Sequence, residues 1–365
     1  MNARLTRFSA PTRIVAGLGA VRSLGEELIG VGHDPVAVVC DRGVADIGLL
    51  DEVLAHAGRR AMVRCTLVGS DPSVAEAEAV VAEAQAAGCR TVLGVGGGSA
   101  LGVAKAVALR LANHARIDAY AGRDQARNKP VPSIAVPTTA GSGSEVSNAH
   151  VLQDPSRDRL LVVRGHGYEP DVALLDGNLL ASLPRSPMLH AALDALTHAL
   201  EALWVHGSGR ITDALALQAA RDIREVLPPA LEHRTPNDLQ RLLEASTMAN
   251  LACGNTGLGL VHALSSATTV RLPHGYQNGV LLRQVAAFNR PVLDEGAVAE
   301  VDGLAALYER LGLDAAFAPG ELSAEDAEAM IAAALDNPFA ANNRRAAEAD
   351  DLRAILDAAR QLAPR

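Results

Sequence analysis

The chain has 365 residues, a length that fits two domains or one large one. Apolar residues make up 49% of it and aromatic residues only 2%, so we expect a core of Ala, Val and Leu, as in a helix-rich α/β protein. The formal net charge of −9 argues against nucleic acid as a partner, because a basic surface is needed to neutralise phosphates.

The cysteines and the start of the chain indicate a compartment. Cys40, Cys65, Cys89 and Cys253 form no C-x-x-C pair, and three of them lie in or beside apolar runs. They are typical of buried free thiols under reducing conditions. The opening MNARLTRFSAPTRIVAG lacks a signal-peptide apolar stretch, and no run of about eighteen apolar residues occurs. We expect a cytoplasmic protein without a membrane span.

Strands and helices alternate between about residues 12 and 184. Apolar runs of strand length alternate with Ala- and Glu-rich segments of helical spacing, which predicts βαβ units and a mostly parallel sheet. The predicted strands are Val36–Cys40, Ala61–Cys65, Thr91–Val95, Ser133–Val136 and Val172–Asp176, with helices at Val74–Ala87 and Ala100–Asn113. This pattern indicates a fold class but no function.

Helical patterns dominate after Leu183-Pro184. The predicted helices are Leu189–Val205, Arg210–Leu227, Asp238–Ala252, Leu258–Thr269, Ala297–Leu311, Ala324–Leu335 and Ala346–Leu362. We therefore predict an α/β Rossmann-like dinucleotide-binding domain over residues 1–184 and an all-helical metal-binding and substrate domain over residues 185–365.

A glycine-rich turn joins the strand at Thr91–Val95 to the next helix. Gly96, Gly97 and Gly98 allow a ligand close to the backbone, and the helix that starts near Ser99 presents free N–H groups. These features favour a diphosphate, but the turn lacks the G-x-G-x-x-G pattern, so a plain tight turn remains an equal alternative.

Polar side chains follow the two neighbouring strands. Pro137–Glu145 is rich in hydroxyls and includes Thr138, Thr139 and Ser142, and ligands bind α/β sheets at such strand ends. Asp41, after Val36–Cys40, either accepts hydrogen bonds from an adenosine ribose, which selects NAD over NADP, or caps the next helix. His150 lies shortly after the hydroxyl-rich loop; one interpretation is that it lines the substrate pocket, but we expect a partly exposed strand residue there.

Four residues of the second half have the chemistry of metal ligands. Asp194 and His198 are four apart, so on a helix they share one face. His262 and His274, from a later helix and the loop after it, can complete a set of one oxygen and three nitrogens. This set suits Fe²⁺ or Zn²⁺. Each histidine alone is more often a satisfied core or loop residue.

Five segments, in order, resemble the iron-containing (group III) alcohol dehydrogenase family over nearly the whole chain. They are Gly96–Ser99, Pro137–Glu145, Pro170–Asp176, Asp194–Glu201, and Gly257–His262 with Pro273–Gly275. The resemblance implies a dinucleotide-binding domain, a helical domain and a metal in the cleft between them.

The resemblance also implies roles for single residues. The metal ligands would be Asp194, His198, His262 and His274, and the last two would contribute to catalysis together with Ser266. The cofactor NAD, rather than NADP, would contact Asp41, Gly96, Gly97, Gly98, Ser99, Thr138, Thr139 and Ser142. The substrate would be a small alcohol or carbonyl compound, and the family often forms homodimers.

The chain departs from the family pattern in three places. Gly102 replaces a common aspartate, a feature shared with maleylacetate reductases, which often lack a full metal set. Ser266 stands where many members have a proton-relaying histidine, and a serine passes a proton only within a chain of hydroxyls or waters. The interval from His262 to His274 is slightly short, which indicates either a tighter loop at Thr268–Pro273 or a reshaped pocket wall.

We therefore expect a metal-dependent NAD(H) oxidoreductase that interconverts an alcohol and an aldehyde or ketone. The alternatives are a metal-free reductase of the maleylacetate type and a dehydroquinate synthase-like cyclase, which uses NAD without net turnover. A catalytically silent binding protein is a third alternative.

Overall fold

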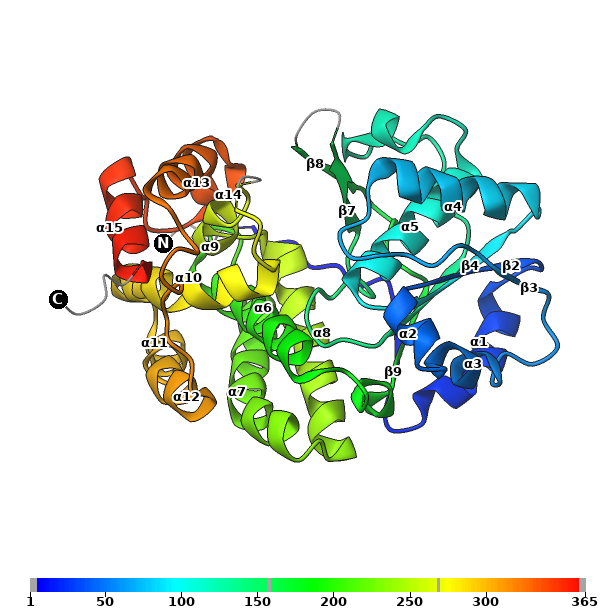
Figure 1. Cartoon of the computed structure of the whole chain (residues 1–365), viewed down its shortest axis with the longest axis horizontal. Helices are drawn as coiled ribbons and strands as arrows, with labels where there is room; N and C mark the ends of the chain where they lie inside the picture. The colour runs from blue at the N-terminus through cyan, green and yellow to red at the C-terminus, as the bar shows by residue number, and fades with distance from the viewer. Residues whose placement is uncertain (1–4, 156–158, 268–269, 361–365) are drawn as a thin grey trace. The chain divides into compact units, whose positions relative to one another are not determined.

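The computed structural model describes residues 5–155, 159–267 and 270–360, and these form two compact units (Figure 1). The α/β unit comprises residues 10–183, and the helical unit comprises the described residues from Pro184 onward together with residues 5–9. The short N-terminal segment groups with the helices because Ser9 and Asn255 exchange two hydrogen bonds, of 2.7 and 2.9 Å. The predicted domain 1–184 did not anticipate this grouping.

A six-stranded parallel sheet forms the centre of the α/β unit, in the order β1-β9-β6-β4-β2-β3. Its strands are β1 (Arg13–Ala16), β2 (Val36–Cys40), β3 (Met62–Arg64), β4 (Thr91–Gly96), β6 (Ser133–Pro137) and β9 (Val172–Leu175). The central strands β2, β4, β6 and β9 are buried on both faces, which explains their continuous apolar sequences. The predicted parallel sheet is confirmed.

Helices cover both faces of this sheet (Figure 1). They are α1 (Leu24–Val31), α2 (Arg42–Asp46), α3 (Leu49–Leu54), α4 (Val74–Ala86) and α5 (Gly98–Ala112). One apolar core joins the sheet to α1, α2 and α3, and the other joins it to α4 and α5. The unit is therefore a doubly wound sheet, as predicted.

The strand order reverses between β2 and β4. From β2 the chain adds β3 on one side, and it then returns to place β4 and β6 on the other side. Ligands of open α/β sheets bind at the carboxyl ends of the strands beside such a reversal. Asp41 follows β2 and the glycine turn follows β4, so both lie at this point.

A small second sheet packs on the same unit in the order β5-β8-β7. Its strands are β5 (Gly122–Arg123), β7 (Ala149–Asp154) and β8 (Arg159–Arg164), of which β7 and β8 are antiparallel. His150 lies on β7 and is fully buried rather than partly exposed as expected, because β7 packs against α5.

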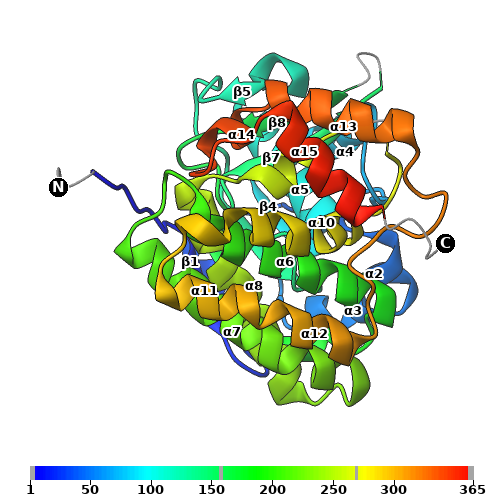
Figure 2. The same ribbon diagram turned by 90° about the vertical axis from the view of Figure 1, so that its left-hand side faces the viewer.

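The helical unit is built from ten helices within the described residues (Figure 2). They are α6 (Arg185–Trp204), α7 (Arg210–Glu232), α8 (Pro236–Thr256), α9 (Leu260–Leu264), α10 (His274–Asn289), α11 (Glu295–Asp302), α12 (Leu304–Leu311), α13 (Ala324–Asp336), α14 (Pro338–Asn342) and α15 (Ala349–Ala359). Across the described parts of the chain, no helix combines the length and apolar character that crossing a membrane requires. Helix α9 ends at Leu264 and α15 at Ala359, before the predicted ends at Thr269 and Leu362, which themselves lie outside the described residues.

Several helices differ from the prediction, including α14, which was not predicted. The segment Ala297–Leu311 is divided at Gly303 into α11 and α12. Helix α10 was not predicted, because Gly275, Asn278 and Gly279 are poor helix formers. His274 is therefore the first residue of a helix and not part of a loop.

The glycines of α10 explain how closely this helix approaches α6. A Cβ atom on Gly275 would lie 2.2 Å from the backbone oxygen of His190, and one on Gly279 would lie 2.6 Å from the Leu193 side chain. Both contacts are closer than a real Cβ allows, so only glycine permits this packing. Helices α10 and α6 therefore pack side by side (Figure 2).

Candidate functional site

Helix α6 provides the carboxylate of a candidate metal centre. Asp194 and His198 are both buried, one turn apart, with Asp194 Oδ1 and His198 Nε2 separated by 3.9 Å. Burial alone would raise the pKa of Asp194, but His198, His262 and His274 hold it well below its usual range. The residue is therefore an anion surrounded by imidazoles.

Three of the four predicted ligands converge closely. Asp194 Oδ1 lies 3.6 Å from His262 Nε2 and 3.8 Å from His274 Nε2, and all three ligand atoms lie within 4.8 Å of one another. Metal–ligand distances of about 2.0–2.2 Å separate tetrahedral ligand atoms by roughly 3.3–3.6 Å. A small movement of the side chains would therefore bring the three ligand atoms to the separations of a tetrahedral metal site, and the donor set fits a divalent metal.

His198 is the looser fourth member. Its ring stacks on that of His262 at 4.8 Å between centroids and 12° between planes. Burial lowers the pKa of His198 to about 4, although Asp194 opposes this effect. The ring is therefore neutral at physiological pH, the state in which an imidazole binds a metal.

Glu201 orients His262. It is fully buried on α6 and accepts hydrogen bonds from the backbone N–H groups of Gly259 and Val261, at 2.8 and 2.6 Å. Its Oε2 also lies 2.7 Å from His262 Nδ1. A proton held on Nδ1 by this carboxylate leaves Nε2 to face Asp194. Against the effect of burial, Glu201 and Asp194 raise the pKa of His262 to about 9, so a bound cation must displace a proton.

The Glu201 contacts lead to a prediction. Glu201→Gln is expected to weaken metal binding by about 10–100-fold, because an amide nitrogen placed against Nδ1 favours the tautomer with a proton on Nε2. Metal affinity of the apoprotein, measured by competition with a chelator, tests this. Glu300→Gln is the matched control: Glu300 is also buried in the helical unit, but it pairs with Arg224. Equal affinity in the two variants would contradict an orienting role.

Two neighbours of the cluster received no role from the sequence. Asp194, His198 and Glu201 stand at positions i, i+4 and i+7 of α6, so all three lie on one face of the helix. This spacing could have indicated from the sequence that Glu201 lies near the cluster. Asn278 lies four residues after His274, and its Nδ2 is 2.8 Å from Asp194 Oδ1. Only the knowledge that α10 is a helix places Asn278 at the cluster.

Ser266 is engaged with other partners. Its hydroxyl donates to the Ala263 carbonyl at 2.7 Å and accepts from Asn337 Nδ2 at 3.0 Å. Any transfer of a proton by Ser266 would have to break the first of these bonds. The predicted tighter loop begins at Thr268 and Thr269, which lie outside the described residues.

At the carboxyl ends of β2 and β4, the predicted cofactor-binding residues of the α/β unit gather. Asp41 Oδ1 accepts from Val44 N at 2.8 Å, which caps α2, and Oδ2 accepts from Gly97 N at 3.1 Å. Gly96 has a φ of +145°, and a Cβ there would lie 2.4 Å from Asp41 Oδ2. The capping alternative for Asp41 is therefore realised, and Asp41 also ties β2 to the glycine turn.

The hydroxyl-rich loop after β6 packs directly on this turn. Thr138 N donates to the Gly96 carbonyl at 3.0 Å. Cβ atoms on Gly97 and Gly98 would lie 3.2 Å from Thr139 and 2.7 Å from Ser142 Oγ. The glycines thus let the loop after β6 approach the N-terminus of α5 closely. A helix N-terminus favours an anionic group such as a diphosphate. Ser99 Oγ, at the same end, accepts from Asp71 N at 3.2 Å.

A buried cation lies further along α5. Lys105 donates to the carbonyls of Ser147 and Ala149, and burial lowers its pKa to about 7 although Glu145 and Glu169 oppose the shift. Burial, followed by the charge of Lys105, lowers the pKa of His150 to about 3, so this imidazole is neutral. Gly102 lies against His150, with 3.8 Å between their Cβ positions. The sequence pattern did not indicate this cluster.

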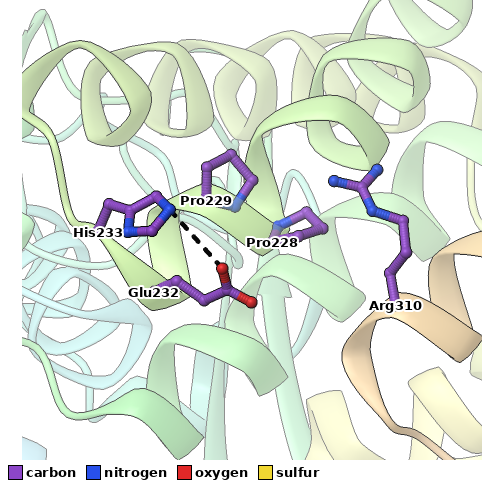
Figure 3. A pocket seen from close by; sticks show the side chains of 5 residues that line it. All are labelled: Pro228, Pro229, Glu232, His233 and Arg310. Atoms are coloured by element: carbon purple, nitrogen blue, oxygen red, sulfur yellow. Dashed lines mark ion pairs between the residues drawn. The ribbon is translucent and has the colours of Figure 1, made fainter.

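A separate hollow of about 340 Å³ in the helical unit is not lined by the candidate metal ligands. Figure 3 shows Pro228, Pro229 and Glu232 of α7 beside His233 and Arg310, with Glu232 paired to His233 at 3.7 Å. None of these residues belongs to the predicted ligand set.

A doubly wound unit with a glycine turn at its strand-order reversal, together with a helical unit carrying one carboxylate and three imidazoles, is typical of metal-dependent dehydrogenases. The family model for iron-containing alcohol dehydrogenase matches residues 11–177, and the model for the C-terminal part of the Fe-containing alcohol dehydrogenase family matches residues 188–297. The chain belongs to the iron-containing alcohol dehydrogenase family.

Individual relatives agree with this. The chain is 31% identical to the NAD-dependent methanol dehydrogenase of Bacillus methanolicus, over 96% of this chain and 99% of that protein. Its fold is similar to a crystal structure of 1,3-propanediol oxidoreductase, with a TM-score of 0.91, 25% identity, and coverage of 98% and 100%. It is also similar to the sulfoacetaldehyde reductase of Bifidobacterium kashiwanohense in complex with NAD⁺, with a TM-score of 0.88, 26% identity, and coverage of 98% and 99%.

These comparisons confirm the family predicted from the motifs, its two-part fold and its class of enzyme, an oxidoreductase that acts on CH–OH groups. They also support an iron-containing family with NAD-dependent members.

Proposed function

We propose that this chain is a metal-dependent NAD(H) oxidoreductase that interconverts a small alcohol and its aldehyde or ketone. The observation that carries the proposal is the convergence of Asp194, His262 and His274 on the buried face of α6. In an alcohol dehydrogenase, this donor set would hold a divalent metal ion. A bound divalent ion supplies Lewis acidity, which polarises a carbonyl oxygen and lowers the pKa of an alcohol.

We propose Fe²⁺ as the metal, with Zn²⁺ as the alternative that the same donor set accepts. Asp194, His198, His262 and His274 would hold it. Glu201 keeps the His262 ring in one orientation, and the burial of Asp194 limits the access of water to the ion. Ser266 would take part in proton transfer only within a chain of hydroxyls or waters.

We propose that the α/β unit binds the dinucleotide. Gly96, Gly97, Gly98 and Ser99 would contact the diphosphate through the N-terminus of α5, and Thr138, Thr139 and Ser142 would flank it and the nicotinamide. Asp41 would accept hydrogen bonds from the adenosine ribose. Each of its oxygens already accepts one N–H, and a carboxylate oxygen has a second lone pair to offer.

We also propose that the protein is a cytoplasmic homodimer. The four cysteines are free and buried, which suits a reducing compartment. Size-exclusion chromatography with light scattering tests the dimer, since a monomeric mass at micromolar concentration would contradict it.

The proposed reaction is tested with protein purified without oxygen. NADH oxidation is followed with a panel of aldehydes, ketones and oxo-acids, before and after chelation and after readdition of Fe²⁺ or Zn²⁺. Net NADH turnover that chelation removes supports the proposal. Turnover that survives complete metal removal would favour a reductase of the maleylacetate type, the class that shares a glycine at the position of Gly102. NADH binding without net turnover would favour a cyclase or a silent binding protein.

The role of Asp41 leads to a prediction about cofactor choice. Asp41→Gly is expected to raise the ratio of kcat/KM for NADPH over NADH by at least about tenfold, because a carboxylate near the ribose repels a 2′-phosphate. Loss of the α2 cap should also lower stability by about 1 kcal/mol. Asp294→Gly, which removes the cap of α11 in the other unit, controls for that loss. An unchanged cofactor ratio would remove Asp41 from the ribose site.

A further inference from the structure

Asn278 occupies the centre of the ligand cluster. This residue of α10 is fully buried, and its Nδ2 lies 2.8 Å from Asp194 Oδ1, 3.0 Å from His274 Nε2 and 3.2 Å from His262 Nε2. These are the three atoms that form the tight part of the predicted ligand set. The amide nitrogen therefore faces the same three atoms that a bound cation would face.

The amide group cannot form hydrogen bonds with all three of these atoms. An NH₂ group has two hydrogens, so it can serve two of the three facing atoms, whereas a cation serves all three at once. The other end of the same amide, Oδ1, is buried and has no hydrogen-bond partner among the described residues. Burying a carbonyl oxygen without a hydrogen-bond partner is unfavourable, so the present orientation does not suit the oxygen end of the amide.

A half-turn about the Cβ–Cγ bond exchanges the two ends of the amide. With a cation bound, the N–H groups would point at a positive charge, which electrostatics disfavours. After the half-turn, Oδ1 would face the cation among Asp194, His262 and His274. An amide oxygen is a hard ligand that suits Fe²⁺. The buried Oδ1 would then have a partner.

The packing of α10 keeps Asn278 in this place. Gly275 and Gly279 let the helix lie directly on α6, so the Asn278 backbone cannot retreat from Asp194 without a shift of the whole helix. Adaptation to an ion therefore falls to the side-chain torsion.

We propose that Asn278 is an additional ligand of the metal: its NH₂ group holds the ligands together before the ion binds, and its Oδ1 coordinates the ion afterwards. This inference rests on the proposed metal-dependent function. It also predicts a preference, since a site with Oδ1 as an extra ligand exceeds the four-coordinate geometry that Zn²⁺ usually adopts.

The experiment uses the full-length apoprotein and Co²⁺, whose visible absorption weakens as coordination number rises. Affinity is measured by chelator competition in wild type, Asn278→Leu and Asn278→Asp. We expect Asn278→Leu to bind Co²⁺ at least about tenfold more weakly, with a more intense, four-coordinate spectrum. Asn278→Asp retains an oxygen, so its affinity should be equal to or higher than that of wild type. Competition with Zn²⁺ should shift toward Zn²⁺ in Asn278→Leu.

The matched control is Asn289→Leu. Asn289 is another fully buried amide of α10, which pairs with Asn343 at 3.2 and 2.8 Å. Its loss should lower thermal stability and leave Co²⁺ affinity and spectrum unchanged.

Two results would overturn the inference alone: an unchanged spectrum and affinity in Asn278→Leu, or equal weakening in Asn278→Leu and Asn278→Asp, which would assign the effect to the NH₂ group. A wild-type protein that binds no Co²⁺, Fe²⁺ or Zn²⁺ would overturn the inference and the proposed function together.

Discussion

Replacing His262 with alanine is expected to lower turnover by about 10³-fold while NADH binding remains largely intact. His262 contributes one of the three closest ligand atoms, and its Nδ1 forms a hydrogen bond with the Glu201 carboxylate. Removing the ring would take one ligand from the proposed metal, whereas the proposed dinucleotide residues all belong to the α/β unit. Turnover, metal content and an NADH fluorescence titration are measured on the same preparation.

The control for this variant is His233→Ala. His233 is an exposed imidazole at the end of α7, and its loss should change neither metal content nor turnover. If His262→Ala instead lost NADH binding, metal and thermal stability together, His262 would be a packing residue and the metal centre would lose its main support.

Replacing Gly96 with alanine is expected to weaken NADH binding by about 100-fold. The added Cβ would lie 2.4 Å from Asp41 Oδ2 and 2.9 Å from the Ala100 Cβ, so the bond from Gly97 N to Asp41 must break and the turn must move. A helix N-terminus binds a diphosphate only when its N–H groups keep their positions. The dissociation constant for NADH measures the effect.

Gly96 also has a positive φ, so part of the effect is backbone strain. Gly88→Ala isolates that part, because Gly88 has a φ of +67° and nothing lies within 4 Å of its added Cβ. We expect Gly88→Ala to lower stability by about 1 kcal/mol and to leave NADH affinity unchanged. Equal NADH affinities in the two variants would show that the Gly96 turn does not contact the cofactor.

Local sequence patterns were sufficient for the five strands and two helices predicted in the α/β unit, but α1, α2, α3 and the small second sheet were not predicted. The buried strands carry continuous apolar runs, and Ser73 and Glu76 form a capping box at the start of α4, so the strands and α4 begin within about a residue of their predicted positions. The same periodicity failed for α10. There the glycines that weaken a helix in isolation are those that let it pack on α6.

The identities of the candidate ligands were readable from the sequence, because Asp194 and His198 share a helical face and His262 and His274 lie in family motifs. Glu201 was visible in the same spacing but received no role. Lys105 of α5 and His150 of β7 are far apart in sequence, so only packing revealed that they are buried near each other.

Sequence by itself thus determined the family, the parallel sheet and the types of side chain available for a metal and a dinucleotide, since these depend on local periodicity and on short motifs. Tertiary structure alone decided which atoms meet: Asp41 with Gly97, Glu201 with His262, and Asn278 with three ligand atoms. Such contacts depend on how closely two distant segments approach, and that distance is set by the shape of every residue between them, as the α6–α10 packing shows.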